Sequence, residues 1–510
     1  MKKKNLLVLG LASLLSLVSC GGGDDDTVVD QYLPVVDPSY QVEFEFWHCL
    51  GHEKTKNLEI IANNFNSKYA GKYHVTLVHP AGDYASLHDV VKQKIAANEI
   101  PALTMGYPDS FSEYITEDIS NSFLLRIDNF IKDANFGFPT SQLADFVPGY
   151  LAEGNQYQFT GFWSMPMYKS TEVMYYNYSY FMGCNPCNAN KFAANAEFLA
   201  KYNKVVGRTL EGDLTLDDDL QDLKAWLVEH DGYVYEVPEK WDEAVALGRQ
   251  MISDRYVEGV TAEFYPFGYD SDSNLLISQM AQLNIPYTVN NEAALEDPTA
   301  HIQFNNSAAQ WLVNDIVSLL DQKILITKNS LGGSIYTNTY FNEGKCAFTV
   351  GSTGGSSYNI SSNFAVKLAK VPYRGTTPKY IQQGPSICFF DKGDVFVHKG
   401  AWLFYKEMSD SVANANFALE NSYDPIRFSS YDTKEYKEWI SHKGQGLKYD
   451  IPAMTAELRN QNVYMTSPVF VGSSTCREEI GNIISYIYGS KMDTATAFGQ
   501  AYDNCVIAVK

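Results

Sequence analysis

Most residue patterns that mark a catalytic centre are missing from the sequence. It contains no GxSxG, no Walker loop and no GxGxxG after a strand, and His52-Glu53 does not continue into HExxH. Glycoside hydrolysis requires two facing carboxylates, and nothing marks Asp270 and Asp272 as such a pair among 60 acidic residues. We therefore predict a protein that is not an enzyme and has no cofactor, with a secreted glycan hydrolase as the alternative.

Two short motifs have residue types that bind ligands or metals. The Gly/Ser-rich segment 351–357 follows an apolar run, so its amides and hydroxyls could hold an anion or sugar hydroxyls, or it could be a plain surface loop. Cys184-x-x-Cys187 could be half of a zinc site, a redox pair or a local disulfide, but the sequence has no second CxxC. We predict no metal site, and expect either a loop disulfide or two free thiols.

The elements that position any site begin with a regular α/β pattern. Apolar residues alternate over 42–46, then recur at helical spacing over 58–65, and the same alternation of strand and helix continues through 75–78, 87–95 and 100–105. This order predicts a parallel sheet. Ligands bind beyond the carboxyl ends of such strands, which directs attention to the loops 47–53, 79–86 and 106–112.

A second α/β region is expected over 178–305. Within it, 188–233 reads as an inserted surface segment, and its acidic run 217–219 lacks the spacing of a calcium loop. The length of 510 residues suits two or three domains or one large bilobal body. The chain has 35 Tyr, whose flat apolar faces and hydroxyls suit polar, ring-shaped ligands, although most Tyr side chains simply pack the core.

The N-terminus predicts export and lipid anchoring. Three Lys precede an apolar run over 6–18, which ends in Leu17-Val18-Ser19-Cys20 and is followed by GGGDDD. We predict a lipoprotein signal peptide over 1–19, lipidation of Cys20 and a flexible tether over 20–40, with the protein at the outer face of the membrane in the cell envelope. The formal charge of −21, which becomes −24 once the three Lys of residues 1–19 are removed, argues against nucleic-acid binding.

Five further segments occur in a fixed order along the chain. They are Phe46-Trp47-His48, Gly82-Asp83-Tyr84, KSTEVMYYN over 169–177, FNEGKCAFT over 341–349 and Tyr423-Asp424-Pro425-Ile426. In this order they resemble the extracellular solute-binding proteins of ABC importers, in the carbohydrate group that includes the glycerol-3-phosphate-binding protein. The resemblance covers roughly residues 42–490 and is interrupted by the insertion.

The resemblance implies a bilobal α/β fold of the type II periplasmic-binding-protein kind. Two lobes with parallel-rich mixed sheets would be joined by a multi-strand hinge, with the ligand in the cleft and closure on binding. The implied division places 41–172 and 306–383 in an N-terminal lobe, and 173–305 and 384–510 in a C-terminal lobe. The chain would cross between the lobes near 171–177, 300–306 and 380–386.

The residues that the resemblance places in the cleft are Tyr84, Tyr107, Ser170, Tyr269, Ser352, Gly384 and Tyr423. The glycerol-3-phosphate binders have an acid after the third-strand Tyr, whereas this chain has Pro108 and then Asp109. Phe470 stands where they place a phosphate-clamping Arg, so Phe470 is expected to be a stacking platform. Arg427 is the best replacement anchor, unless it is an ordinary surface Arg.

We therefore expect a neutral sugar, oligosaccharide or related polyol as ligand, with glycerol-3-phosphate or its diester as the alternative. The implied partners are ABC permease subunits in the membrane, and the protein itself is expected to be a monomer. A surface adhesin built on the same lobes is a further alternative.

Overall fold

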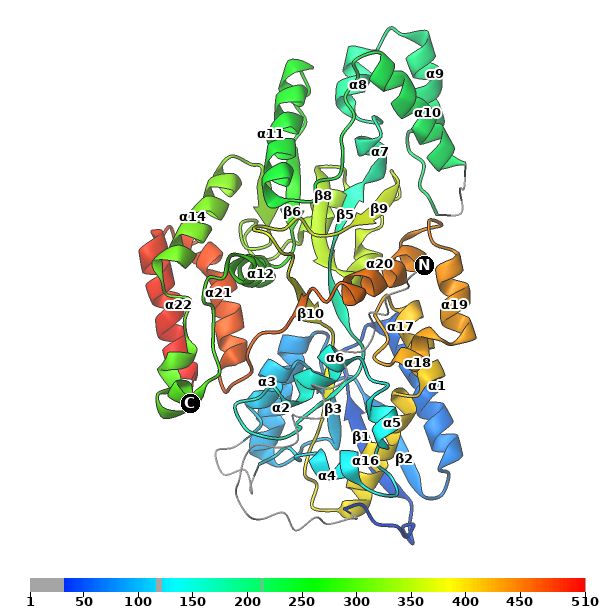
Figure 1. The fold of residues 1–510 in the computed structure, drawn as a ribbon, viewed down its shortest axis with the longest axis vertical. Coiled ribbons are helices and arrows are strands. Elements are labelled where there is room, and N and C mark those ends of the chain that lie inside the picture. Colours follow the sequence, from blue (N-terminus) through cyan, green and yellow to red (C-terminus); the bar gives the residue numbers. More distant parts are fainter. Residues whose placement is uncertain (1–31, 116–121, 212, 214, 510) are drawn as a thin grey trace, which may run out of the picture.

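The computed structural model describes residues 32–115, 122–211, 213 and 215–509. The predicted signal peptide, Cys20 and residues 20–31 of the predicted tether lie outside these ranges. The described chain forms two α/β lobes, one above the other along the long axis, and each lobe is built on its own sheet (Figure 1).

The sheet of lobe 1 contains the predicted N-terminal strands. Its order is β2 (Tyr73–Val78), β1 (Val42–Trp47), β3 (Leu103–Gly106), β11 (Ser386–Phe389) and β4 (Met165–Pro166). β1 is parallel to both β2 and β3, whereas β11 is antiparallel to β3 and β4. The predicted strand–helix–strand–helix–strand order is confirmed, because α1 (His52–Lys68) and α2 (Tyr84–Ala97) connect these parallel strands.

Lobe 1 also contains several short helices, and two longer helices within residues 395–420. They are α3 (Pro108–Ser112), α4 (Asp128–Lys132), α5 (Thr140–Leu143), α6 (Pro148–Ala152), η3 (Glu153–Asn155), α16 (Val395–Met408), α17 (Ser411–Glu420) and α18 (Phe428–Tyr431). The helical periodicity of α1 is explained by burial, since Leu58, Ile61, Ala62 and Phe65 form its inner face.

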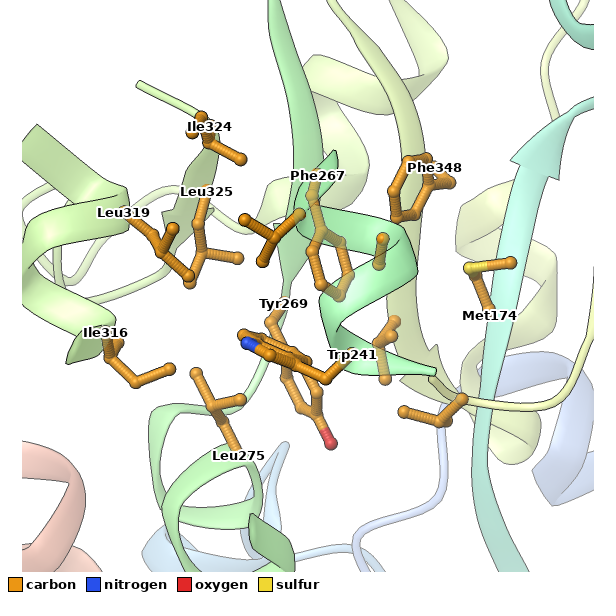
Figure 2. Close-up of a cluster of buried hydrophobic side chains, with 14 of the residues drawn as sticks. Met174, Trp241, Phe267, Tyr269, Leu275, Ile316, Leu319, Ile324, Leu325 and Phe348 are labelled. Carbon is orange, nitrogen blue, oxygen red and sulfur yellow. The ribbon is translucent and has the colours of Figure 1, made fainter. Parts of the chain in front are cut away.

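Lobe 2 contains a larger mixed sheet. Its order is β12 (Tyr464–Met465), β10 (Tyr380–Gln383), β5 (Ser170–Asn177), β8 (Cys346–Ser352), β6 (Tyr265–Tyr269) and β7 (Leu325–Thr327), with β9 (Val366–Ala369) also paired to β5. Figure 2 shows its core, where Phe267 and Phe348 of neighbouring strands meet Trp241 of α11 (Trp241–Val257) and Ile316 of α14 (Ser307–Asp321).

The remaining helices of lobe 2 cover this sheet and carry the insertion. They are α7 (Tyr178–Phe181), α12 (Asp272–Leu283), α13 (Glu292–Glu296), η4 (Pro298–His301), α15 (Thr337–Asn342), η5 (Thr353–Asn359), α21 (Ser473–Tyr488) and α22 (Thr494–Ala508). The inserted segment forms α8 (Pro186–Lys191), α9 (Ala196–Val205) and α10 (Leu216–Glu229), which lie at the end of lobe 2 remote from lobe 1 (Figure 1). Its acidic run forms the first turn of α10, where Asp217 pairs with Lys367 at 2.7 Å.

The lobe boundaries differ from the predicted division. Residues 306–383 were expected in the N-terminal lobe, but their strands β8 and β10 pair with β5, so this segment completes the sheet of lobe 2. Residues 384–426 were expected in the C-terminal lobe, but β11 joins the sheet of lobe 1 and Ile426 packs in its core. Antiparallel pairing to β5 is the physical reason, because it keeps the chain in lobe 2 until β10 ends.

Two of the three expected crossings lie next to the predicted positions, between β4 and β5 and between β10 and β11. The crossing expected near 300–306 is wrong, since both η4 and α14 belong to lobe 2. The third passage lies within α18, α19 (Lys434–Ser441) and α20 (Leu447–Asn460), because Ile426 packs in lobe 1 and Leu458 in lobe 2.

Residues at the end of the predicted tether are packed rather than free. The backbone N–H groups of Tyr32 and Leu33 donate to Asp133 Oδ2 at 3.0 and 2.9 Å, and Leu33 is buried in the core of lobe 1. Lys399 Nζ donates to the carbonyl of Pro34 at 2.8 Å. The prediction of a flexible segment up to residue 40 is therefore wrong for these residues.

Cys184 and Cys187 are free thiols. Over the described ranges no group of His, Cys, Asp and Glu is arranged to hold a metal ion. None of the helices in those ranges is both long enough and apolar enough to span a membrane.

Candidate ligand-binding cleft

A small cavity lies between the lobes, beside the hinge. Its lining comes from the core and loops of lobe 1 (Tyr107, Pro108, Asp109, Glu153 and Val469), from β10 (Ile381, Gln382 and Gln383) and from lobe 2 and the segment that leads into α21 (Tyr287, Thr288, Thr466, Ser467, Pro468, Ser473 and Arg477). Its volume is about 50 Å³, which is room for only a few water molecules.

The lobes touch each other on both sides of this cavity. On one side Lys54 Nζ of α1 donates to the carbonyl of Gly354 in η5 at 2.6 Å. On the other side Ser112 Oγ donates to the carbonyl of Phe470 at 2.7 Å, and Ser474 Oγ donates to Glu113. The cleft is therefore closed, and a sugar-sized molecule can enter only when the lobes separate.

The polar end of the cavity, which we define as Asp109, Glu153, Gln383 and Arg477, brings charges from both lobes together. Asp109 belongs to the first turn of α3 in lobe 1, and Arg477 to α21 in lobe 2. Burial raises the pKa of Asp109, and the Arg477 guanidinium partly offsets that increase. A carboxylate that accepts and a guanidinium that donates thus line one cavity.

Several polar atoms of the lining have no protein partner. Within the described chain, Thr288 Oγ1, Gln383 Oε1 and Ser467 Oγ are buried and make no hydrogen bond. Each unpaired buried polar atom costs about 1–3 kcal/mol. These three atoms are therefore available for hydrogen bonds to a molecule in the cavity.

A buried ion pair joins the polar end to the hinge. Lys169, which precedes β5 and is fully buried, pairs with Glu153 and also donates to Gly384 O at 3.3 Å and Ser386 Oγ at 3.2 Å. Gly384 has φ +92°, and a Cβ there would lie 2.4 Å from the carbonyl oxygen of Tyr168. Only glycine fits here, so the two crossings approach each other closely beside the cavity.

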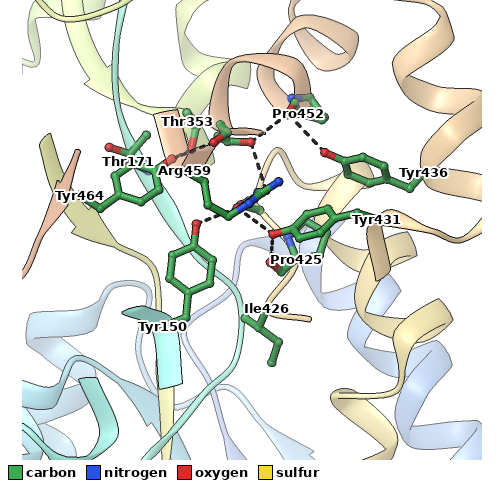
Figure 3. A network of polar contacts seen from close by, with 12 residues as sticks. Tyr150, Thr171, Thr353, Pro425, Ile426, Tyr431, Tyr436, Pro452, Arg459 and Tyr464 are labelled. Carbon is green, nitrogen blue, oxygen red and sulfur yellow. Dashed lines mark hydrogen bonds and ion pairs between the residues drawn. The ribbon is translucent and has the colours of Figure 1, made fainter. Parts of the chain in front are cut away.

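A second polar cluster holds the other side of the hinge. The buried Asp424 carboxylate accepts from Arg459 at 2.6 Å, Tyr150 at 2.7 Å and Tyr431 at 3.0 Å. Figure 3 shows these side chains converging from three different elements. Asp424 also exchanges two backbone hydrogen bonds with Lys169, so α20 and the first crossing are fixed to the same point of lobe 1.

The aromatic end of the cleft, which we define as Tyr84, Tyr107 and Tyr423, lies beside the Lys54 contact. The rings of Tyr84 and Tyr107 are 4.6 Å apart, and Lys54 Nζ lies 4.6 Å from the centre of the Tyr423 ring. Burial raises the pKa of Tyr84 well above its ordinary value, and the neighbouring Tyr423 and Tyr107 hydroxyls raise it further. The structure thus brings together three Tyr that the sequence placed in the cleft, and Tyr107 connects them to the polar end.

Three other predicted residues lie near the hinge without lining the cavity. Ser170 and Ser352 are adjacent, with their Oγ atoms 3.4 Å apart. Tyr269 is buried in the core of lobe 2, and its hydroxyl donates to Glu172 at 2.5 Å. Tyr269 therefore contacts residues beneath the cavity rather than the cavity itself.

Two predicted ligand contacts are corrected. Arg427 does not face the cavity, because its guanidinium pairs with Asp145 at 2.8 Å and lies over the Phe146 ring in lobe 1. Phe470 cannot be a stacking platform, because it is fully buried and its ring stacks on His301 at 4.1 Å. Both side chains are occupied by partners far away in the sequence.

Sequence reasoning missed most of the polar end. Glu153, Gln383 and Arg477 carry no motif or spacing that marks them, and Asp109 was noted only because it follows Pro108. Arg477 could have been found only by considering each Arg of the sequence in turn, because the chain has only eight of them.

Known proteins match this chain in fold but not in sequence. No family model matches it, and no curated protein matches it in sequence. The GacH receptor of Streptomyces glaucescens, solved unliganded and with acarbose, is 13% identical with a TM-score of 0.62, over 93% of this chain and 100% of that chain. UgpB from Mycobacterium tuberculosis, in complex with glycerophosphocholine, is 15% identical with a TM-score of 0.63, over 91% and 98%.

A third match is the ABC substrate-binding protein Lmo0181 from Listeria monocytogenes in complex with cycloalternan. It is 12% identical with a TM-score of 0.61, over 92% of this chain and 98% of that chain. The predicted class is confirmed at the level of the fold: this is a bilobal α/β protein of the type II binding-protein kind. The likeness to these three solved structures extends over at least 91% of this chain and concerns the fold.

Proposed function

We propose that this protein captures a neutral sugar or oligosaccharide between its lobes and delivers it to an ABC permease. The observation that carries the proposal is that Asp109 of lobe 1 and Arg477 of lobe 2 line one interlobe cavity with several unpaired polar atoms. Neighbouring hydroxyls on a sugar ring can donate to a carboxylate and accept from a guanidinium at the same time. A ligand that satisfies both residues stabilises the closed state by its differential affinity.

The charges of the cavity support a neutral ligand. The one cation of its lining, Arg477, lies near Asp109, and Lys169 behind the lining is paired with Glu153. No surplus positive charge remains for a phosphate, and the chain as a whole carries −21, which opposes the approach of anions.

A phosphodiester such as glycerophosphocholine, or glycerol-3-phosphate, is the second candidate ligand. Arg477 favours it, because a guanidinium in a closed cleft can form a bidentate contact to phosphate oxygens. A structural neighbour, UgpB, was solved with glycerophosphocholine.

A hydrolase remains the enzymatic alternative and would release reducing sugar from a glycan.

The test is titration calorimetry with the purified protein, using maltotriose, glycerophosphocholine and glycerol-3-phosphate at low and moderate salt. We expect maltotriose or a related oligosaccharide to bind with little salt dependence and without release of reducing sugar. Binding of only the phosphate compounds, weakened by salt, would overturn the neutral-ligand proposal.

The anchoring proposal is supported by the Leu17-Val18-Ser19-Cys20 sequence alone. The protein would be a monomer, held at the outer face of the membrane by lipid on Cys20, next to the permease. Wild-type protein should enter the detergent phase on partition, and Cys20→Ala should remain in the aqueous phase. Wild-type protein in the aqueous phase would contradict anchoring.

A further inference from the structure

A chain of polar side chains behind Arg477 ends in a buried carboxylate. Glu172 of β5 is 3% exposed and Asn274 of α12 is 2% exposed. Asn274 Nδ2 donates to Glu172 Oε1 at 2.7 Å, and Arg477 Nη2 donates to Asn274 Oδ1. The other carboxylate oxygen of Glu172 accepts from the Tyr269 hydroxyl at 2.5 Å.

The chemistry of these groups fixes the direction of the chain. An ionised carboxylate can only accept hydrogen bonds and a guanidinium can only donate them. The amide between them must therefore turn its nitrogen to Glu172 and its oxygen to Arg477. Only one guanidinium N–H is used by Asn274, so the others remain available on the cavity side.

Arg477 has no other firm support in the described part of the chain. No carboxylate there lies within 4.0 Å of its guanidinium, and Asn274 is its one hydrogen-bond partner. A long side chain with a single contact loses its rotamer freedom only if that contact is itself rigid. Asn274 is rigid because both ends of its amide are bonded and because α12 is buried along most of its length.

We propose that Glu172 and Asn274 are positioning residues that hold the Arg477 guanidinium in the interlobe cavity. The arrangement makes Glu172 a determinant of ligand affinity although it does not line the cavity. That Arg477 then contacts a ligand oxygen rests on the proposed function, whereas the positioning of Arg477 by this chain does not.

The proposal predicts an unusual pattern among three variants. In Glu172→Gln, position 172 has one acceptor oxygen instead of two, so Asn274 Nδ2 and the Tyr269 hydroxyl compete for it and Asn274 loses part of its support. In Asn274→Asp, two carboxylates meet, and they repel each other at a pH high enough to ionise both. In the double variant Glu172→Gln/Asn274→Asp, the amide introduced at position 172 can donate to the carboxylate introduced at position 274. That carboxylate can accept from Arg477. The double variant thus restores the series of hydrogen bonds and keeps the original net charge of residues 172, 274 and 477.

The first measurement needs no ligand. In protein labelled with ¹⁵N at arginine, the Nη2–H signal of Arg477, whose proton donates to Asn274, should be protected from exchange with water, and it is assigned by its loss in Arg477→Lys. Each single variant should lose this protection, and the double variant should regain it. An unchanged Arg477 signal in Glu172→Gln would overturn the proposal, as would a double variant that is worse than both singles while its thermal stability is normal.

The second measurement uses maltotriose and glycerophosphocholine as probes. Each single variant should bind the recognised probe about tenfold more weakly, the loss of one hydrogen bond to a charged group, and the double variant should return to within about threefold of wild type. If the Arg477 signal follows the predicted pattern but neither probe shifts it, the positioning chain stands and the proposed function fails.

Discussion

The two ends of the cleft differ in how completely their side chains are satisfied. At the aromatic end Tyr84 and Tyr107 contact each other, and Lys54 already bridges Tyr423 and Gly354. At the polar end Gln383 Oε1 has no partner within the described chain, and Asp109 and Arg477 bring opposite charges to the cavity without an ion pair within 4.0 Å. The aromatic end thus offers surface for ring faces, and the polar end offers unused hydrogen bonds that a ligand can complete.

The difference predicts that the polar end determines affinity. Arg477→Ala should weaken sugar binding about 100-fold, or about 2.7 kcal/mol, because hydrogen bonds to charged groups contribute about 1.5–3 kcal/mol. Arg249→Ala is the matched control, since Arg249 is exposed and makes only a 3.4 Å contact with Gln322. Equal calorimetric affinities of the two variants would place the ligand elsewhere.

Carboxylates near the cleft should give the protein a distinctive dependence of stability on pH. Burial raises the pKa of Glu172 to about 7, although Tyr269, Asn274 and Arg477 oppose the shift, and burial also raises that of Asp272 to about 7. These folded-state values exceed those of the unfolded chain, so the folded state binds more protons and the free energy of unfolding should fall as pH rises from about 5 to 8, by about 5 kcal/mol for the two groups together.

Glu113 should act in the opposite direction at lower pH. Its hydrogen bonds with His88, Lys92 and Ser474 outweigh burial and lower its pKa to about 2, so its stabilising contribution should be lost as pH falls from about 4.5 to 2. Urea unfolding between pH 3 and 8 measures both effects. Glu172→Gln should flatten the slope between pH 5 and 8, and a slope identical to wild type would show that Glu172 does not titrate there.

The aromatic end should contribute a smaller part of the affinity. Tyr84→Ala and Tyr107→Ala should each weaken oligosaccharide binding about tenfold, the scale of a lost aromatic contact. Tyr358→Ala, at a side chain that is 67% exposed, is the control. If Tyr84→Ala weakens oligosaccharide binding more than Arg477→Ala does, the aromatic end contributes more to the affinity than the polar end.

Lys54→Ala should have the smallest effect, about twofold on affinity. It removes one closing contact between the lobes and the cation over Tyr423, while Lys56→Ala on the same helix removes only an exposed pair with Glu53. Small-angle scattering of the ligand-free protein should show a larger radius of gyration for Lys54→Ala than for Lys56→Ala. Equal radii would show that this contact does not hold the cleft closed.

The sequence predicted local elements well because burial repeats at short range. The alternation over 42–46 and the helical face over 58–65 each place apolar residues on one side of a single element. The lobe boundaries were predicted wrongly because they depend on β8 and β10 pairing with β5, a contact between segments about 180 to 210 residues apart that no local pattern records.

The predictions for the site also succeeded where a local sequence pattern existed and failed where the contact is between distant segments. Tyr84, Tyr107 and Tyr423 stand next to strand or turn segments with recognisable sequences, and the structure brings them together. Arg427 was predicted wrongly because its partner Asp145 lies 282 residues earlier in the chain. Arg477 could not be predicted, because only folding brings α21 against α3 and α12.

The central claim, that one ligand bridges Asp109 and Arg477 across the closed cleft, is tested most directly by a double-mutant cycle in titration calorimetry. Maltotriose would be titrated into wild type, Asp109→Asn, Arg477→Lys and the double variant. The account predicts losses of at least about tenfold for each single variant and a double variant whose loss is smaller than the combined losses, because both residues contact the same hydroxyls. Affinities within about twofold of wild type in both single variants would contradict it.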